Sequence, residues 1–248
     1  MFIRILTIVV TFIVTISQVL SQDVEEIIKK TLEARGDVAT YKGLTSLIMS
    51  GTQFQMGMNI PFKLYVKKIN EKKSKYEFES EAMGSKQQLG YNGDTMWVYA
   101  GPEIQIVPDE YVEQYLPQIS QIKDFAETPL MKYKEKGHTL ELSGSVNEDG
   151  RDAYTLKLIQ NEERESYLYI DKNNFELFKI FATMPGQDGE DIEIEMNYSD
   201  YKAVNGFKLP YKMVLKMGEL GTIEMMLDKV EFNPVIDDSI FQVPKEQK

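Results

Sequence analysis

The sequence of 248 residues contains no cysteine and a single histidine, His138. Without cysteine, the chain forms neither disulfides nor a thiolate nucleophile, and we expect no lipidation at an N-terminal cysteine. A single histidine excludes zinc sites built from several histidines, and the absence of cysteine excludes Cys–His catalytic pairs. The fold must therefore be stabilised by its core alone.

Motifs for catalysis and phosphate binding are lacking as well. No G-x-S-x-G motif accompanies His138, and the scattered glycines form no G-x-x-x-x-G-K-[ST] loop. The acidic runs Glu162–Glu165, Asp188–Asp191 and Asp237–Asp238 lack the alternating oxygen ligands of a calcium loop and are typical of solvated turns. We therefore expect no enzyme, no catalytic residue, no metal and no cofactor. A carboxylate pair brought together from distant strands is the one acid/base arrangement that the sequence leaves open.

Long apolar runs are absent except at the N-terminus. Residues 1–21 hold one charge, Arg4, followed by the apolar run Ile5–Ile16. This pattern predicts a signal peptide cleaved after Ser21, and hence secretion. The alternative, an uncleaved anchor, is disfavoured because a spanning helix needs about 20 apolar residues and threonines dilute this run. We expect residues 22–248 to form a single domain, since all-β folds of this size are common.

The charge balance is acidic. The chain carries 28 basic and 39 acidic side chains, and removal of Arg4 with the signal peptide lowers the formal net charge from −11 to −12. Nucleic acids and anionic membrane surfaces are poor partners for such a protein. We expect no nucleic-acid binding.

The first residues after the predicted cleavage site have the pattern of an amphipathic helix. Val24, Ile27, Ile28 and Leu32 recur at helical spacing after an Asp-x-x-Glu capping box, and Gly36 provides a stop signal. We predict a short N-terminal helix with one buried face.

From Tyr41 onward the hydrophobic period changes to two, which indicates antiparallel strands with one dry face. Alternating segments include 60–66, 76–78, 154–158, 192–198 and 207–213. Turn signals separate them at Met58–Asn59, Asn92–Asp94, Asp149–Gly150, Asp171–Asn174, Gly186–Gly189 and Asn205–Gly206. About ten strands at this spacing predict a mainly β (α+β) fold, in which a strongly curved antiparallel sheet forms an unclosed barrel.

One segment, about 102–129, departs from the β pattern. We interpret it as a helical insertion that begins at Asp109, is kinked or divided at Pro117, and covers the sheet as a lid. Its predicted apolar stripe comprises Tyr111, Val112, Tyr115, Leu116, Ile119 and Ile122.

Adaptable apolar side chains are abundant. The chain has 13 methionines, 14 tyrosines and 12 phenylalanines beside one tryptophan. Such residues either fill an ordinary core or line a permissive apolar site. Strand parity selects as candidate lining residues Phe62, Leu64, Tyr76, Phe78, Leu156, Leu158, Ile194, Met196, Tyr211, Met213 and Leu215. An acyl chain of about sixteen carbons offers on the order of 10 kcal/mol on burial before association costs, so such a site needs no signature residue.

Several stretches, in this order and spacing, resemble the outer-membrane lipoprotein-sorting proteins, the LolA/LolB-like family, and within it the secreted members without a lipidation cysteine. The stretches are Leu32–Gly36, Leu44–Gly51, Met58–Phe62, Tyr91–Trp97, Gly150–Leu158, Tyr167–Asp171, Ser199–Met213 and Ile236–Pro244. The resemblance implies an unclosed antiparallel barrel covered by helices, a periplasmic location, and an apolar cavity for the acyl chains of lipids or lipoproteins.

Two hypotheses follow for function. The first is a monomeric, non-enzymatic periplasmic carrier of lipid or lipoprotein acyl chains, involved in outer-membrane lipoprotein sorting or envelope lipid handling, with envelope membrane proteins as further partners. The alternative is a sensor or interaction module of the same fold whose cavity is filled by its own side chains. An unrecognised hydrolase is the least favoured reading, because nothing in the sequence sets up a nucleophile.

Overall fold

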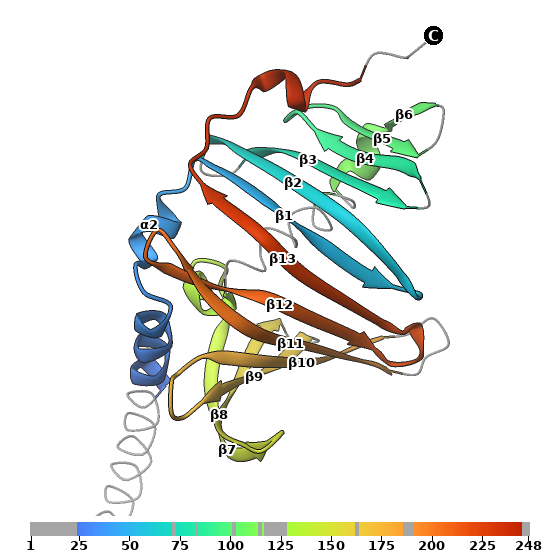
Figure 1. Cartoon of the computed structure of the whole chain (residues 1–248). Coiled ribbons are helices and arrows are strands. Elements are labelled where there is room, and N and C mark those ends of the chain that lie inside the picture. The colour runs from blue at the N-terminus through green and yellow to red at the C-terminus, as the bar shows by residue number, and fades with distance from the viewer. Residues whose placement is uncertain are drawn as a thin grey trace, which may run out of the picture. The chain divides into compact units, whose positions relative to one another are not determined.

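The computed structural model describes residues 24–70, 73–82, 84–100, 103–113, 116, 128–161, 164–185 and 191–244. The predicted signal peptide, 1–21, and the turn predicted at Gly186–Gly189 lie outside these residues. Strands β1 to β13 and helix α2 are labelled in Figure 1.

Strands dominate the described part of the chain. They are β1 (Ser46–Gln55), β2 (Met58–Asn70), β3 (Lys73–Ala82), β4 (Ser85–Tyr91), β5 (Met96–Ala100), β6 (Ile104–Val107), β7 (Thr139–Glu148), β8 (Arg151–Asn161), β9 (Arg164–Asp171), β10 (Leu177–Pro185), β11 (Asp191–Val204), β12 (Phe207–Met217) and β13 (Thr222–Phe232). In the described part of the chain they form one sheet with the order β6-β5-β4-β3-β2-β1-β13-β12-β11-β10-β9-β8-β7. Strands β6 and β7 end this order, so the sheet is not closed. The predicted fold class, a mainly β protein with an open antiparallel sheet, is confirmed.

The chain forms two compact units. Unit 1 comprises Met1–Gly36 and Pro129–Asn197, and unit 2 comprises Asp37–Thr128 and Tyr198–Lys248. Strand β11 begins in unit 1 and ends in unit 2. The expectation of a single domain stays a prediction.

Unit 1 contains a helix at 24–34, the short 3-10 helix η1 (Pro129–Met131), and the strands β7 to β10 with the start of β11. The helix is the predicted N-terminal one, and it buries Val24, Ile27 and Ile28. Asp149 and Gly150 both have positive φ, 51° and 77°, so the predicted β7–β8 hairpin turn is confirmed.

Unit 2 contains the remaining strands, the short helix α2 (Val38–Lys42) and two 3-10 turns, η2 (Gly218–Leu220) and η3 (Asp238–Phe241). Asp37 caps α2 by accepting a hydrogen bond from the Thr40 backbone N–H. The ring of Tyr41 on α2 stacks on that of Phe207 at 4.9 Å between centroids, which fixes α2 on β12. The predicted turns at Asn92–Asp94 and Asn205–Gly206 are confirmed.

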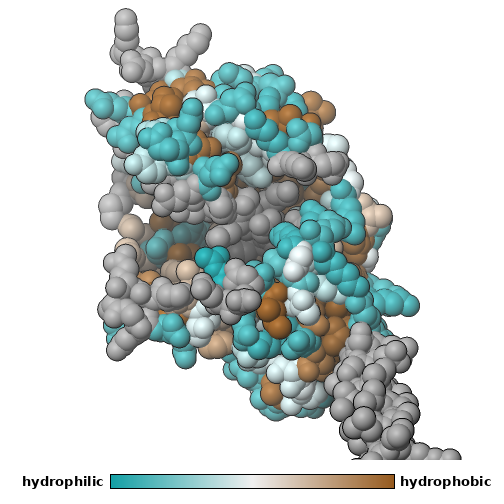
Figure 2. Space-filling view, turned by 180° about the vertical axis from the view of Figure 1, so that it is seen from behind, coloured by the Kyte–Doolittle hydropathy of each residue, from teal (hydrophilic) through white to brown (hydrophobic). Residues whose placement is uncertain are grey.

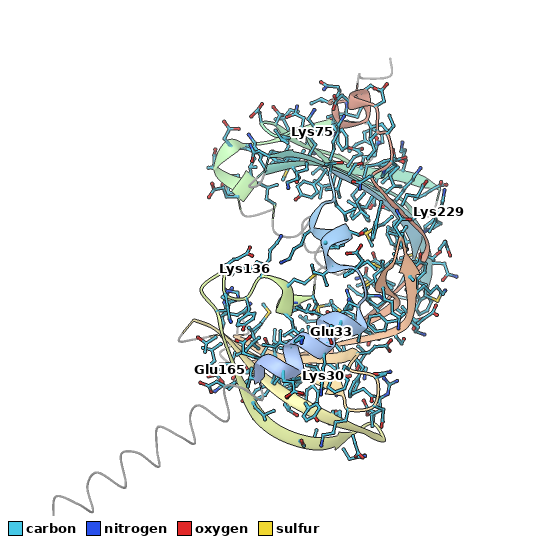
Figure 3. The ribbon with its side chains drawn as sticks, turned by 90° about the vertical axis from the view of Figure 1, so that its left-hand side faces the viewer. Lys30, Glu33, Lys75, Lys136, Glu165 and Lys229 are labelled. Carbon is cyan, nitrogen blue, oxygen red and sulfur yellow. The ribbon has the colours of Figure 1, made fainter. Side chains whose placement is uncertain are left out.

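The C-terminal segment is tied to the sheet of unit 2 by ion pairs. Asp238 of η3 pairs with Lys67 of β2 at 3.1 Å and with Lys75 of β3 at 2.8 Å. Lys75 is labelled in Figure 3. Phe241 at the end of η3 is fully buried. This segment therefore covers the face of β2 and β3 from which Lys67 and Lys75 project.

Two expectations about the strands were inaccurate. The described residues contain thirteen strands rather than about ten, because short β4, β5 and β6 carry little alternation of their own. The turn expected at Met58–Asn59 lies at Met56–Gly57 instead, and Met56 takes a left-handed conformation with φ 51°. A methionine is an uncommon residue for that conformation, which is why the sequence pointed to the later Asn59.

The prediction that the whole of the 102–129 segment departs from the β pattern was wrong at its start. Residues Ile104–Val107 form strand β6, which pairs with β5. A helical stretch follows at 109–113, and it begins with Asp109 in its first turn. Among the stripe residues, Val112 is buried, Leu116 is half-buried and Tyr111 is 49% exposed. Three further residues of the stripe, Tyr115, Ile119 and Ile122, lie outside the described residues.

Candidate ligand-binding faces and pocket

One face of the unit 2 sheet carries all seven lining residues predicted there. Strand register places Leu64 opposite Phe78 and Met213 opposite Met225, which in turn faces Gln53 of β1. Since every second residue of a strand shares a face, the set lies together on one side: Phe62, Leu64, Tyr76, Phe78, Tyr211, Met213 and Leu215. The structure thus brings these residues of unit 2 onto a common apolar face.

This apolar face of unit 2 has a sealed part and a half-exposed part. Leu64 and Met213 are buried, as are Phe62, Tyr76 and Tyr211. Phe78 and Leu215 are only half-buried. The rings of Phe62 and Phe78 stack at 5.9 Å between centroids, so the half-buried ring is positioned by the buried one.

The half-exposed part of this face continues into strands that the sequence prediction missed. Leu89 of β4 lies opposite Phe78, and Val98 of β5 lies opposite Leu89. Both side chains are half-buried. Each belongs to a strand too short to show a clear period of two, and register alone reveals their common face.

The four lining residues predicted in unit 1 also share a face of their own strands. Leu156 is opposite Leu168, Leu168 opposite Ile180, and Ile180 opposite Met196. Leu158 and Ile194 belong to the same row by parity. Leu156 and Leu158 are buried, whereas Ile194 and Met196 are half-buried. Each unit therefore has an apolar sheet face with buried and half-buried members.

A pocket of about 280 Å³ opens in unit 1 beside the helix at 24–34. Its walls come from that helix, from β7 and β8, and from the β9–β10 turn: Glu26, Ile27, Lys30, Leu142, Tyr154 and Phe175. The rings of Tyr154 and Phe175 stack at 6.1 Å with an interplanar angle of 24°. The pocket therefore combines an apolar, aromatic wall with two charged side chains.

The charged side chains of the pocket come from one helix turn. Lys30, labelled on the helix in Figure 3, pairs with Glu26 at 2.7 Å, and its Nζ lies 5.2 Å from the Phe175 ring centroid. The hydrogen bond and charge of Lys30 lower the pKa of Glu26, and Glu26 in turn raises the pKa of Lys30. Both groups are ionised at neutral pH, with Lys30 above an aromatic face.

Phe175 is held in an unusual backbone conformation. Its φ is +58°, in the left-handed region that bulky residues rarely adopt. The turn is fixed by the Phe175 N–H, which donates to the Asp171 carbonyl at 2.9 Å, and by the Asn173 N–H, which donates to Asp171 Oδ1 at 2.8 Å. The sequence predicted this turn but not that it delivers a ring to a pocket.

The opposite face of the unit 2 sheet buries the carboxyl group of Glu77 on β3, although the sequence pattern predicted that this face is exposed to solvent. Glu77 is 1% exposed, and its Oε1 accepts a hydrogen bond from Gln88 Nε2 at 3.0 Å. Burial, followed by the charge of Glu79, raises the pKa of Glu77 to about 8. Glu77 Oε2 and Trp97 Nε1 find no hydrogen-bond partner among the described residues.

Unit 1 buries a lysine in a comparable way. Lys179 of β10 pairs with Glu148 at 2.6 Å and with Glu195 at 2.7 Å. Burial opposes the charged form, but the two hydrogen-bonded carboxylates outweigh it, so the pKa of Lys179 is raised. The triad links β7, β10 and β11.

Other chemistry is sparse in the described part of the chain. No group of three or more His, Cys, Asp or Glu side chains is placed there to hold a metal ion. His138 lies just before β7, where its backbone N–H donates to the Tyr133 carbonyl at 2.8 Å. Within the same residues, no helix is long and apolar enough to cross a membrane. Figure 2 shows hydrophobic residues in separate groups between hydrophilic ones on the face it presents.

The open antiparallel sheet with few helices is similar to the folds of several solved proteins. A solved DUF1329 family protein from Desulfovibrio piger matches with a TM-score of 0.57 and 12% identity, over 88% of this chain and 96% of that one. A LolA superfamily protein from Nitrosomonas europaea matches with a TM-score of 0.53 and 14% identity, over 88% and 96%. A putative outer membrane lipoprotein-sorting protein domain from Vibrio parahaemolyticus gives 0.52 and 13%, over 87% and 94%.

These likenesses confirm at the level of the fold the resemblance inferred from the sequence. They cover most of both chains at low identity, so they define an architecture and not a ligand. A scan against protein-family models found no match, and a search of curated protein sequences found none either.

Proposed function

We propose that this protein is a non-enzymatic periplasmic carrier that shelters an acyl chain of a lipid or lipoprotein against the apolar faces of its sheet. The resembling family, the predicted signal peptide and the apolar faces support this proposal together. The carrier acts as a monomer, and the part of the 102–129 segment that follows β6 serves as its lid. Its role lies in outer-membrane lipoprotein sorting or related handling of envelope lipids.

The observation that carries the proposal is the row of half-buried apolar side chains on β3, β4 and β5, close to the β6 edge of the unit 2 sheet. Phe78, Leu89 and Val98 lie opposite one another on three neighbouring strands. A fully packed core would bury apolar residues on paired strands, whereas these three are only half-buried. Covering them with methylene groups is favourable by about 25 cal/mol per Å² of apolar surface removed from water.

The chemistry of the row suits an acyl chain. No charge lies among Phe78, Leu89 and Val98, and the buried neighbours Leu64 and Tyr91 extend the apolar face beneath them. A saturated acyl chain has no group that needs a hydrogen-bond partner. Its affinity therefore scales with the apolar surface that is buried on binding. The half-buried Ile194 and Met196 of unit 1 provide a second apolar surface of the same kind.

Native mass spectrometry of the protein purified without detergent tests the proposal. The expected spectrum contains protein with a bound lipid whose mass survives gentle activation. Phe78→Gln and Leu89→Gln place an amide on the half-buried row, and each should weaken the affinity for the lipid about tenfold and so lower the bound fraction, because an amide buried without a partner costs roughly 1–3 kcal/mol. Val235→Gln is the matched control, since Val235 is fully exposed and its substitution should change nothing.

The buried parts of both apolar faces favour one alternative, a sensor or interaction module whose interior is filled by its own side chains. Leu64, Leu156 and Leu168 have no measurable exposure, so much of each face is filled by the protein's own side chains. A sensor or interaction module of the same fold would need no bound lipid. Purified protein that carries no lipid and takes up no fatty acid would support this alternative over the carrier.

A further inference from the structure

Strand β7 is the long free edge of the sheet. It ends the strand order, and its only strand partner among the described residues is β8. The opposite edge, β6, has four residues, whereas β7 has ten. In an antiparallel pair, every second residue directs both its N–H and its C=O away from the partner strand. The outer side of β7 thus presents a ladder of backbone groups long enough for another strand.

The sequence of β7 does little to protect this edge. Natural edge strands are usually short, or carry lysine or proline. Thr139–Glu148, which reads TLELSGSVNE, has no basic residue and no proline. Its protective feature is an irregularity between Leu142 and Gly144, where the register with β8 shifts by one residue. The segment before this shift, Thr139–Leu142, is a regular strand.

The pocket of unit 1 lies on the face beside this edge. Leu142 of β7 belongs to its wall, and so does Tyr154 of the adjacent β8. A strand added alongside β7 would direct every second side chain to the same face as Leu142. One of these side chains can enter the 280 Å³ pocket against the stacked rings of Tyr154 and Phe175.

The backbone of Phe175 supports a binding role for this wall. A left-handed conformation costs a bulky residue roughly 1–2 kcal/mol, and such costs concentrate at functional sites. Phe175 is half-buried and stands at the pocket wall. The strain keeps an aromatic ring where glycine or asparagine would fit the backbone better.

The opposite face of β7 carries one exposed carboxylate in its regular segment, Glu141. Lys157, which lies opposite it on β8, forms its ion pair with Glu165 at 2.7 Å. The chain as a whole has a formal charge of −11. A strand beside Glu141 would gain from a basic residue on that face and from an apolar residue on the pocket face.

We propose that β7 and the adjacent pocket bind an extended peptide segment of a partner protein that alternates basic and apolar residues. The peptide adds an edge strand at Thr139–Leu142, its backbone groups pair with the outer side of β7, and one apolar side chain occupies the pocket. Backbone hydrogen bonds supply affinity, and the alternate side chains supply specificity.

Fluorescence anisotropy with a capped, labelled nine-residue peptide tests this proposal. The probe alternates lysine and valine, with one central phenylalanine. We expect saturable binding to the full chain, and amide hydrogen exchange should slow in β7 on addition of the peptide. A peptide of the same composition with its lysines in one block, and an N-methylated version of the probe, should each bind at least about tenfold more weakly, since neither can add a strand with apolar residues on one face.

Phe175→Gly removes the ring and suits the left-handed backbone, so this variant should stay folded. It should weaken binding of the probe about tenfold, as expected for loss of an aromatic anchor. Met56→Gly is the matched control, because Met56 is also a bulky residue with positive φ but lies in unit 2. Its binding should equal that of the natural sequence.

Three results would overturn the proposal. The first is equal binding of the alternating, blocked and N-methylated peptides, which would indicate attraction of charge alone. The second is an unchanged exchange rate in β7 with the peptide bound. The third is protection of β7 that rises with protein concentration without peptide, which would assign the edge to a second copy of this chain. None of these results depends on bound lipid, so they leave the carrier function to its own test.

Discussion

The indole of Trp97 lies directly over Gly90, in the space that a side chain at position 90 would occupy. A methyl group built on Gly90 would meet Cζ2 and Cε2 of Trp97 and Oε2 of Glu77. Trp97 and Gly90 are register partners on β5 and β4, and Glu77 is the partner of Gly90 on β3. Because Gly90 has no side chain, the Trp97 ring and the Glu77 carboxyl group can both be buried on the same face of β3, β4 and β5.

This relationship predicts that Gly90→Ala destabilises unit 2. The added methyl group would displace the Trp97 ring or the Glu77 carboxyl group, and overpacking of this kind costs about 1–3 kcal/mol. Urea denaturation followed by the fluorescence of Trp97, the single tryptophan, measures the change. Gly43→Ala is the control: a methyl group there meets the Ala39 carbonyl at 3.3 Å, and its cost should be clearly smaller.

Glu77 predicts a pH dependence of the free energy of unfolding. Its pKa is about 8 in the folded protein and about 4.5 in the unfolded chain, so folding takes up a proton between these values. Stability should therefore fall as pH rises from about 4.5 to about 8 and level off above that. Glu77→Gln should remove this contribution and stabilise the protein at pH 8 by on the order of 2–4 kcal/mol.

Glu79→Gln separates the two causes of the raised pKa of Glu77, which are burial and the charge of Glu79. The Glu79 charge raises the pKa of Glu77, so this variant should keep the slope but move its upper limit to lower pH. Urea denaturation at half-unit steps between pH 4.5 and 9 measures both variants. A Glu77→Gln profile parallel to that of the natural sequence would show that Glu77 is not buried as a neutral acid.

The two ion pairs of Lys179 predict that the stability effects of substitutions at Lys179, Glu148 and Glu195 are not additive. Lys179→Met leaves Glu148 and Glu195 close together without their shared cation, which should cost about 3 kcal/mol. Adding Glu148→Gln and Glu195→Gln should restore most of this loss, because the repulsion disappears. Thermal denaturation of the Lys179→Met variant and of the triple variant measures how much stability the two glutamate substitutions restore. Equal stability of the two variants would contradict the coupling of the three charges.

Met56 predicts a stabilising substitution. Its side chain is 82% exposed and its φ is 51°, so it gains little from burial while its backbone is strained. Met56→Gly should raise the free energy of unfolding by about 0.5–1 kcal/mol, since the relief of strain exceeds the entropy that glycine adds to the unfolded chain. Met58→Gly, two residues later in β2, should lower it; a loss of stability in Met56→Gly would count against the turn geometry.

The sequence was sufficient for the fold wherever a period of two ran over several residues. Phe62 and Leu64 of β2, or Leu156 and Leu158 of β8, alternate with polar residues, and each pair lies on the expected face. The N-terminal helix followed from Val24, Ile27 and Ile28 in the same way. Hydrophobic periodicity reports which face of an element meets the core, and these residues meet it.

The sequence was insufficient where burial depends on a distant partner. Glu77 alternates with Tyr76 and Phe78 as a surface residue would, yet Gly90 and Trp97, brought beside it by two further strands, leave it buried. Phe175 follows a polar turn, and only the packing of Tyr154 beneath it reveals the pocket. Ile104–Val107 lies in a segment that was expected to depart from the β pattern, yet it joins the sheet by pairing with β5.

Titration of the delipidated protein with a sixteen-carbon fatty acid that carries a terminal fluorophore is the most direct test of an acyl-chain site. We predict a saturable rise in fluorescence with one chain bound per protein. Phe78→Gln should weaken the affinity about tenfold, and Val235→Gln should leave it unchanged. Fluorescence that does not saturate, or that is identical in the Phe78→Gln variant, would contradict an acyl-chain site on this face of the sheet.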